Sequence, residues 1–135
     1  MSAVVSVNPL LPLAGRILIS ALFLTAGVRK AVTFAGTVGY LAKLGFPAPE
    51  VMAVIAIIIE IGGSILLIAG WRTRWVAWLL ALFVLIAAFA AHRFWEFDAT
   101  QINNQLNHFL KNLAIIGGLL FIAAFGPGST SVDKA

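Results

Sequence analysis

The chain of 135 residues contains no cysteine. It can therefore form no disulfide and use no thiol of its own in redox chemistry. Charge is also scarce: charged residues make up 10% of the chain, and nine basic against five acidic side chains give a formal net charge of +4. The basic residues are scattered singly and form no patch that could follow a phosphate backbone, so nucleic acid is not an expected partner.

Apolar residues are abundant instead, at 61% of the chain, and the mean hydropathy is +1.03. No soluble domain of this size needs so much apolar surface, so we expect a lipid bilayer to solvate much of it. The positive charge then indicates contact with anionic lipid head groups. We expect one domain over residues 1–135.

Four stretches approach the length of about 20 apolar residues that a membrane-spanning helix needs. The predicted spans cover residues of about 13–31, 51–70, 75–91 and 106–125. The sequence therefore predicts an all-α integral membrane protein with a four-transmembrane-helix bundle. Phe34, Val38 and Leu41 recur at helical spacing between the first two spans, which predicts a short interfacial helix there.

The opening segment 1–16 lacks the basic start and clear cleavage pattern of a signal peptide, so we expect a short tail before a retained span. An even number of spans puts both termini on one side of the membrane, here called the termini side. The connections 32–50 and 92–105 then lie on the opposite side, here called the loop side. Basic residues flank both sides, so the positive-inside rule favours neither orientation.

Glu60 lies in the middle of the second predicted span, ~13 Å from its start. A carboxylate at this depth costs at least ~2.5 kcal/mol, so it must be protonated, paired or facing water. Small residues share its face of the helix, namely Ala53, Ala56, Gly63 and Ser64. Two interpretations follow: an ion pair that fixes the bundle, or a ligand or proton site.

Lys111 is the predicted partner of Glu60, because it lies one to two turns inside the fourth span and enters from the loop side. Lys30 belongs to the same leaflet and ends a helical stripe of Arg16, Ser20, Phe23, Gly27 and Lys30. Either lysine could instead extend its flexible stem to the head groups as an interfacial anchor.

His92 and His108 lie near the loop side, at the end of the third span and the start of the fourth. An imidazole could ligate a metal or haem, bond a quinone carbonyl or carry a proton, or it could be an ordinary interfacial side chain. Two histidines and the acid Glu96 lack the tight spacing of a structural metal site, so we expect no metal.

Asn104, His108 and Lys111 share one face of the fourth span at i, i+4 and i+7, with Asn112 on its flank. We expect this stripe to face the bundle interior, towards Glu60. His92 and Lys30 would form the rim. The prediction is one polar ligand pocket in the loop-side leaflet.

Four segments resemble the DoxX family, especially its small inner-membrane proteins of the YqjF/YphA type: "RILISALFLTAGVRKAVTFAGTVGYLAKLGFPAP", "EIGGSILLIAGWRTRWVA", "AAHRFWEFD" and "HFLKNLAIIGGLLFIAAFGPGS". The likeness spans about residues 16–131. The matching positions are Gly27, Lys30, Glu60, Gly62, Gly63, Gly70, His92, Lys111, Asn112 and the stop Gly126–Pro127–Gly128. The resemblance implies a four-span protein of the bacterial inner membrane.

The family is linked with quinone-associated oxidation, thiol-stress complexes and responses to quinones or catechols, and distant relatives are eukaryotic cargo receptors. The resemblance therefore implies a redox-associated module that binds a quinone-like molecule. Because this chain has no thiol, electron transfer would need a bound cofactor or a partner oxidoreductase subunit. Two alternatives remain open: a protein that binds or transports a small solute or lipid, and a non-enzymatic scaffold for a partner or a second copy. The motifs single out no catalytic residue.

Overall fold

The computed structural model describes residues 6–133, and every regular element in that range is helical. The α-helices are α1 (Leu10–Val32), α2 (Phe34–Lys43), α3 (Pro49–Ala69), α4 (Thr73–Ala91) and α5 (Ile102–Phe125), with the 3-10 helix η1 (Phe94–Glu96) after α4. The four longer α-helices are long and apolar enough to cross a membrane. The predicted fold, with four spans and a short helix between the first two, is confirmed. Residues 1–5 of the predicted N-terminal tail lie outside the described residues.

Local chemistry explains where the spans begin and end. The first span begins at Leu10, earlier than predicted, because the Leu10 N–H donates to Asn8 Oδ1 at 2.9 Å and the helix starts there. The α3 helix ends at Gly70, which has φ +71°, and α5 ends at Gly126, which has φ +80°. Glycine adopts these positive φ values without the steric penalty of a Cβ atom, so both ends are sharp.

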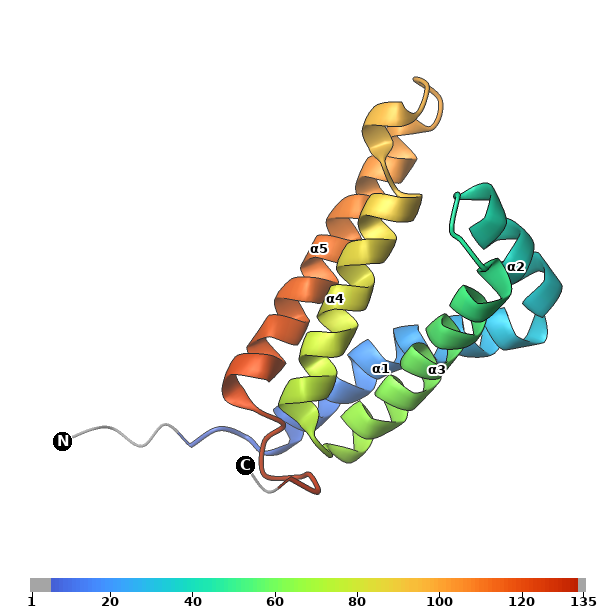
Figure 1. Cartoon of the computed structure of the whole chain (residues 1–135). Coiled ribbons are helices and arrows are strands. Elements are labelled where there is room, and N and C mark those ends of the chain that lie inside the picture. Colours follow the sequence, from blue (N-terminus) through green and yellow to red (C-terminus); the bar gives the residue numbers. More distant parts are fainter. Residues whose placement is uncertain (1–5, 134–135) are drawn as a thin grey trace.

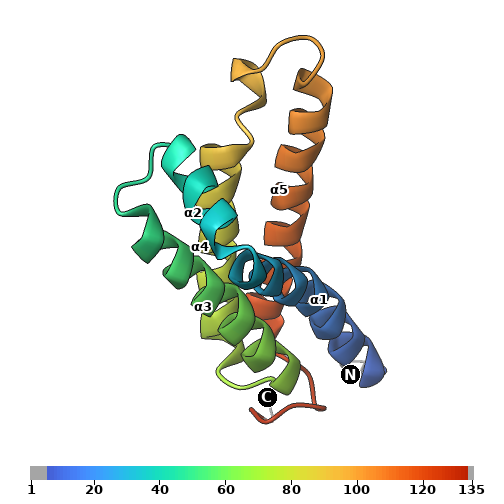
Figure 2. The same cartoon turned by 90° about the vertical axis from the view of Figure 1, so that its right-hand side faces the viewer.

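The spans are grouped as two antiparallel pairs, α1 with α3 and α4 with α5, and α2 folds back onto α3. Figures 1 and 2 show the two pairs meeting at the end of the molecule where the described chain begins and ends. From there the pairs diverge towards the loop side (Figure 1). The helix arrangement therefore separates the loop-side end of α1 from the loop-side end of α5.

One apolar core holds the two pairs together. All four spans contribute to it, and α4 contributes most: the buried side chains are Phe23, Leu67, Val76, Ala77, Leu80, Ala81, Val84, Leu119 and Ala123. The outward faces carry large exposed apolar side chains such as Leu18, Trp75 and Phe125, which are 72%, 74% and 75% exposed. Such faces suit a protein whose surroundings are lipid.

Small residues allow the helices to approach closely. A Cβ atom on Gly27 of α1 would lie 2.7 Å from Ile61 Cγ1 and 3.0 Å from Glu60 Cβ on α3. A Cβ on Gly63 of α3 would lie 2.9 Å from Leu80 Cδ2 on α4. Helices inside membranes associate through close packing of this kind, because lipid gives no hydrophobic driving force between them.

The buried Arg16 side chain joins three segments at the termini side. It is 1% exposed, and its Nε donates to Pro127 O at 3.0 Å. Its Nη1 donates to Leu67 O at 3.0 Å and Ile68 O at 2.6 Å, and Nη2 donates to Thr130 O. The last carbonyls of a helix have no partner within the helix. Arg16 therefore satisfies the end of α3 and fixes the segment that follows α5.

The C-terminal segment also closes the turn between α3 and α4. The Asp133 carboxylate accepts hydrogen bonds from Arg72 N at 2.7 Å, Thr73 N at 2.8 Å and Thr73 Oγ1 at 2.7 Å. The Asp133 N–H donates to Gly70 O at 2.9 Å. The bond from the Thr73 backbone N–H is the largest of several that lower the pKa of Asp133 below its usual value. Asp133 thus caps the start of α4.

We expect Gly27→Ala to destabilise the fold by about 1–3 kcal/mol, because the new methyl group overpacks the contact between α1 and α3. The measurement is equilibrium unfolding in mixed detergent micelles, followed by circular dichroism. Gly62→Ala is the matched control, since no heavy atom lies within 4 Å of its Cβ position. That change should be neutral or stabilise by about 0.5–1 kcal/mol. Equal effects at the two positions would contradict a close α1–α3 contact.

We expect the stabilisation by Asp133 to disappear in acid. Its folded-state pKa lies below the unfolded value of about 3.9, so the contribution is complete above that value and is lost as the pH falls through the folded-state pKa. The thermal midpoint of the wild-type protein should exceed that of Asp133→Asn at about pH 6, and the difference should shrink progressively as the pH falls below about 3.9. A difference that does not change with pH would contradict the capping role.

Candidate functional site

An intramembrane ion pair joins α1 to α3. Lys30 Nζ lies 2.9 Å from Glu60 Oε1 and 3.0 Å from Oε2, so one ammonium binds both carboxylate oxygens. Glu60 is 3% exposed, whereas the Lys30 side chain is 32% exposed. A charge in hydrocarbon needs such a partner. Because the two charges neutralise each other, the pair stabilises the contact between the helices.

The local packing explains this pairing. Gly27 brings the α1 backbone against Glu60, and Lys30 follows one helical turn later on the same face. The hydroxyl of Ser64 donates to the Glu60 carbonyl, and the hydroxyl of Thr37 in α2 donates to the Lys30 carbonyl at 3.1 Å. The pair is therefore held by three helices.

A hollow of about 230 Å³ lies beside the exposed part of Lys30. Its lining residues are Ala26, Arg29, Lys30 and Thr33, all at the loop-side end of α1 or just after it. Arg29 is exposed and has no ion-pair partner among residues 6–133. The ion pair can thus be reached from the loop-side surface at the Lys30 end, whereas Glu60 is enclosed.

The predicted pairing of Glu60 with Lys111 is wrong. Lys111 lies on α5, in the other helix pair, and is exposed, with no ion pair to any described residue. Both lysines occur in the loop-side half of their spans, but depth does not determine which helices are neighbours. The small-residue face of α3 and the stripe on α1 that ends at Lys30 were the sequence signals for the observed pair.

The two histidines lie together at the loop-side end of α4 and α5. The rings of His92 and His108 are stacked, with centroids 4.9 Å apart and an interplanar angle of 20°. His92 Nδ1 lies 2.8 Å from Gln105 Oε1. Because an amide oxygen only accepts, Nδ1 is the donor of this bond, and Nε2 of the neutral ring is left as an acceptor. Gln105 was missed as a functional residue, although its place three residues before His108 puts both on one helix face.

Four aromatic rings from α4, η1 and α5 lie close to the histidines in the sequence. Phe109 packs against Phe89, Phe94 and Trp95, with ring centroids 5.4, 5.5 and 6.0 Å away. Phe94 and Trp95 belong to η1, so the loop folds over the end of the helix pair. We call the set His92, Gln105, His108, Phe89, Phe94, Trp95 and Phe109 the loop-side cap. It offers flat apolar surfaces and imidazole nitrogens at the loop-side end of α4 and α5.

The remaining predicted site residues lie on α5. Asn104, His108 and Lys111 are exposed, and Asn112 is half-buried. The seven predicted residues thus form one group at Lys30 and Glu60 and another along α4 and α5. No hydrogen bond or ion pair between described residues joins the two groups. Within residues 6–133, no three histidine or acidic side chains are grouped so that they could hold a metal ion.

We expect Lys30→Met to destabilise the protein by about 1–3 kcal/mol, because it leaves the Glu60 carboxyl without its partner. This is below the roughly 3–5 kcal/mol for a fully buried pair, since Lys30 is partly exposed. The double change Lys30→Met with Glu60→Leu should be less destabilising than Lys30→Met alone. Equilibrium unfolding in mixed micelles measures both.

The control pair is Lys111→Met with Glu60→Leu. Because Lys111 does not contact Glu60, the effects of these two changes should add. Additive effects for Lys30 and Glu60, or strong coupling between Lys111 and Glu60, would contradict the observed pairing.

Comparison with known proteins identifies the family. The sequence profile of the DoxX family matches residues 11–93, from α1 to the end of α4. The inner membrane protein YphA of Escherichia coli K12 is 35% identical over 127 residues, which cover 94% of this chain and 91% of that protein. The inner membrane protein YqjF of the same organism is 38% identical over 122 residues, which cover 90% and 88%.

A shorter match joins this chain to a eukaryotic protein. The ER-derived vesicles protein ERV29 of Saccharomyces cerevisiae is 30% identical over 78 residues, which cover 58% of this chain and 25% of that protein. No solved structure matches the chain. The family profile, the two bacterial relatives and the four apolar spans agree: the chain belongs to the DoxX family and is a multi-pass protein of the bacterial inner membrane.

Proposed function

We propose that this protein is a quinone-linked membrane module, and that the quinone ring binds at the loop-side cap. The observation that supports this most is the stacked His92–His108 pair, with Gln105 holding His92, at the same end of α4 and α5 as a cluster of aromatic rings. A quinone has a flat ring with carbonyl acceptors and an apolar tail. The aromatic rings suit its faces, and the surrounding lipid suits its tail.

The polar stripe on α5 supplies the hydrogen-bond donors. His108 and Lys111 are exposed on one helix face, and Lys111 has no ion-pair partner among the described residues. An ammonium or a protonated imidazole nitrogen can donate to a quinone carbonyl oxygen. His92 Nε2 can accept a hydrogen bond from the hydroxyl group of the reduced form. The two oxidation states would therefore use different atoms of one site.

Reduction of a quinone to a quinol takes two electrons and two protons. The imidazole nitrogens can donate or accept hydrogen bonds to the quinone oxygens, and a partner oxidoreductase subunit would supply the electrons, with the protons drawn from the loop-side solvent. The role proposed for this chain is to bind and orient the quinone for that partner. In this proposal the Lys30–Glu60 pair serves the fold, because its charges already neutralise each other.

A scaffold that docks a partner or a second copy is the second candidate. It is favoured by α5, which exposes several large apolar side chains, namely Leu110, Leu113, Leu120, Phe121 and Phe125. A docking surface needs no ring site, so quinone binding separates the two candidates.

We expect a short-chain ubiquinone to quench Trp95 fluorescence saturably in protein reconstituted into nanodiscs. The variant carries Trp71→Phe, Trp75→Phe and Trp78→Phe, which leaves Trp95 as the sole tryptophan. Adding His108→Leu should weaken binding about tenfold, which corresponds to about 1.4 kcal/mol. This is the size expected for a lost hydrogen bond to a charged or polar partner.

The control protein keeps only Trp75, which lies at the termini side. Because quinone also partitions into the bilayer, Trp75 should show only weak quenching that rises linearly with concentration. Equal quenching of Trp75 and Trp95, or saturable quenching that is unchanged by His108→Leu, would contradict a ring site at the loop-side cap.

A further inference from the structure

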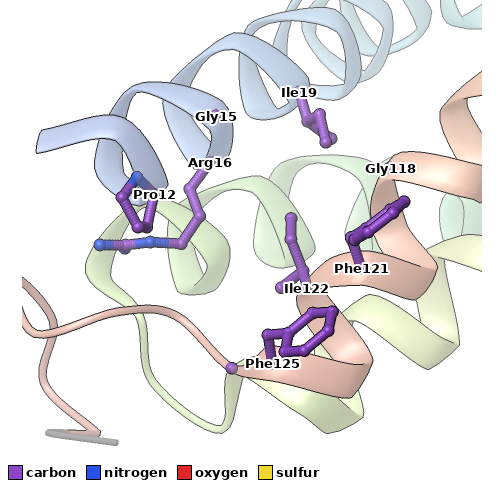
Figure 3. A pocket seen from close by; sticks show the side chains of 9 residues that line it. Pro12, Gly15, Arg16, Ile19, Gly118, Phe121, Ile122 and Phe125 are labelled. Atoms are coloured by element: carbon purple, nitrogen blue, oxygen red, sulfur yellow. The ribbon is translucent and has the colours of Figure 1, made fainter. Parts of the chain in front are cut away.

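An apolar groove runs between α1 and α5 at the termini side (Figure 3). Its volume is about 330 Å³. Gly15 and Ile19 line it from α1, while Gly118, Phe121 and Phe125 line it from α5. No heavy atom lies within 4 Å of a Cβ built on Gly15, so this glycine leaves the groove open. The groove is separate from the loop-side cap, which lies at the other end of α5.

The depth of the groove matches one leaflet. Gly118 and Phe125 are seven residues apart on α5, so the groove extends ~10 Å along the helix. It starts at the end of α5, where the span leaves the membrane. Half of the hydrocarbon core is ~15 Å thick. A chain that enters at the termini-side surface and runs towards the bilayer centre would therefore follow this groove.

The groove offers apolar contact surface and little hydrogen-bonding capacity. Arg16 is its one charged lining residue, and four of the five guanidinium N–H groups already donate to backbone carbonyls. A polar ligand would lose its hydration with few replacement bonds there. An alkyl chain has no hydrogen bonds to water that it would lose on binding. The apolar lining therefore favours an alkyl chain as the ligand.

A cation lies at the surface end of α5. Arg74 is exposed, and its Nη1 donates to Ala124 O at 2.9 Å, next to the groove residue Phe125. It forms no ion pair with any described acid. A guanidinium has five N–H groups, so Arg74 keeps several for a phosphate oxygen.

We propose that this groove binds a phospholipid from the termini-side leaflet, with one acyl chain between α1 and α5 and the headgroup phosphate at Arg74. The occupant is thus an anionic membrane lipid that stays bound as part of the protein. The groove supplies the length and apolar surface for the chain, and Arg74 supplies the complementary charge.

The test is native mass spectrometry of the full chain, released from mild detergent micelles that contain phosphatidylglycerol. We expect one retained phosphatidylglycerol per chain. Gly15→Leu should reduce its occupancy at least tenfold, because the new side chain fills the groove. Gly62→Leu is the matched control: its Cβ position is equally open, it lies on α3, and lipid retention should not change. Retention in Gly15→Leu equal to that of the wild-type protein would overturn the proposal.

The headgroup contact has its own variant. Arg74→Gln should reduce the preference for phosphatidylglycerol over phosphatidylcholine by roughly fivefold, the effect of one basic side chain near a lipid surface. An unchanged preference would overturn the assignment of the phosphate to Arg74.

If Gly15→Leu does not fold, photo-crosslinking of the wild-type protein tests whether an acyl chain occupies the groove. A phospholipid with a diazirine in its acyl chain should label residues 12–19 and 118–126 in preference to the other lipid-facing surfaces. Even labelling over all exposed helix faces would mean ordinary bilayer contact and would overturn the proposal.

Discussion

The fold depends on the guanidinium group of Arg16, which is buried where the two helix pairs meet. It bonds to the last carbonyls of α3 and to the segment that follows α5, while its own backbone belongs to α1. Backbone carbonyls that face hydrocarbon without a partner cost several kcal/mol each. One side chain thus satisfies the acceptors of two chain segments and connects three parts of the molecule. This explains why the pairs are closely joined at the termini side and free to diverge at the loop side.

The other polar side chains differ in the same respect, namely whether their hydrogen-bonding groups already have a partner within the fold. Lys30 and Glu60 bind each other between α1 and α3, so their charges are used within the fold. His108 and Lys111 lie exposed on α5, so their hydrogen-bonding groups are available to a ligand or a partner. A pocket built on Glu60 would have combined structural and ligand-binding roles in one place. The helix pairing keeps these roles apart.

Membership of the DoxX family gives this arrangement its biological setting, the bacterial inner membrane. Because the chain has no cysteine, the proposed ring site depends on the imidazole and aromatic side chains of the loop-side cap and not on a thiol. The proposed ring site and the proposed lipid groove occupy opposite leaflets. Because α5 contributes to both, a ligand at one end of this helix and a lipid at the other would stabilise the same element, which is the most exposed of the four spans.

The sequence by itself determined the helices and their faces. Long apolar runs fixed the number of spans, and helical periodicity identified the stripe from Arg16 to Lys30 and the small-residue face of α3 around Glu60. These features depend on the spacing of residues along one helix, which a sequence contains in full. The position of α2 followed in the same way from its helical spacing.

Only the tertiary structure decided which faces meet. Lys30 and Lys111 are chemically equivalent candidates in the same leaflet, and the choice between them depends on helix pairing, which periodicity within a helix does not encode. The role of Arg16 could not be predicted either, because its partners are backbone carbonyls. Every residue has a backbone carbonyl, so the sequence does not show which ones Arg16 will bind. Contacts between distant segments are set by how the whole chain packs, so the bonds that define the fold and separate the two polar groups arise only when all four spans are assembled.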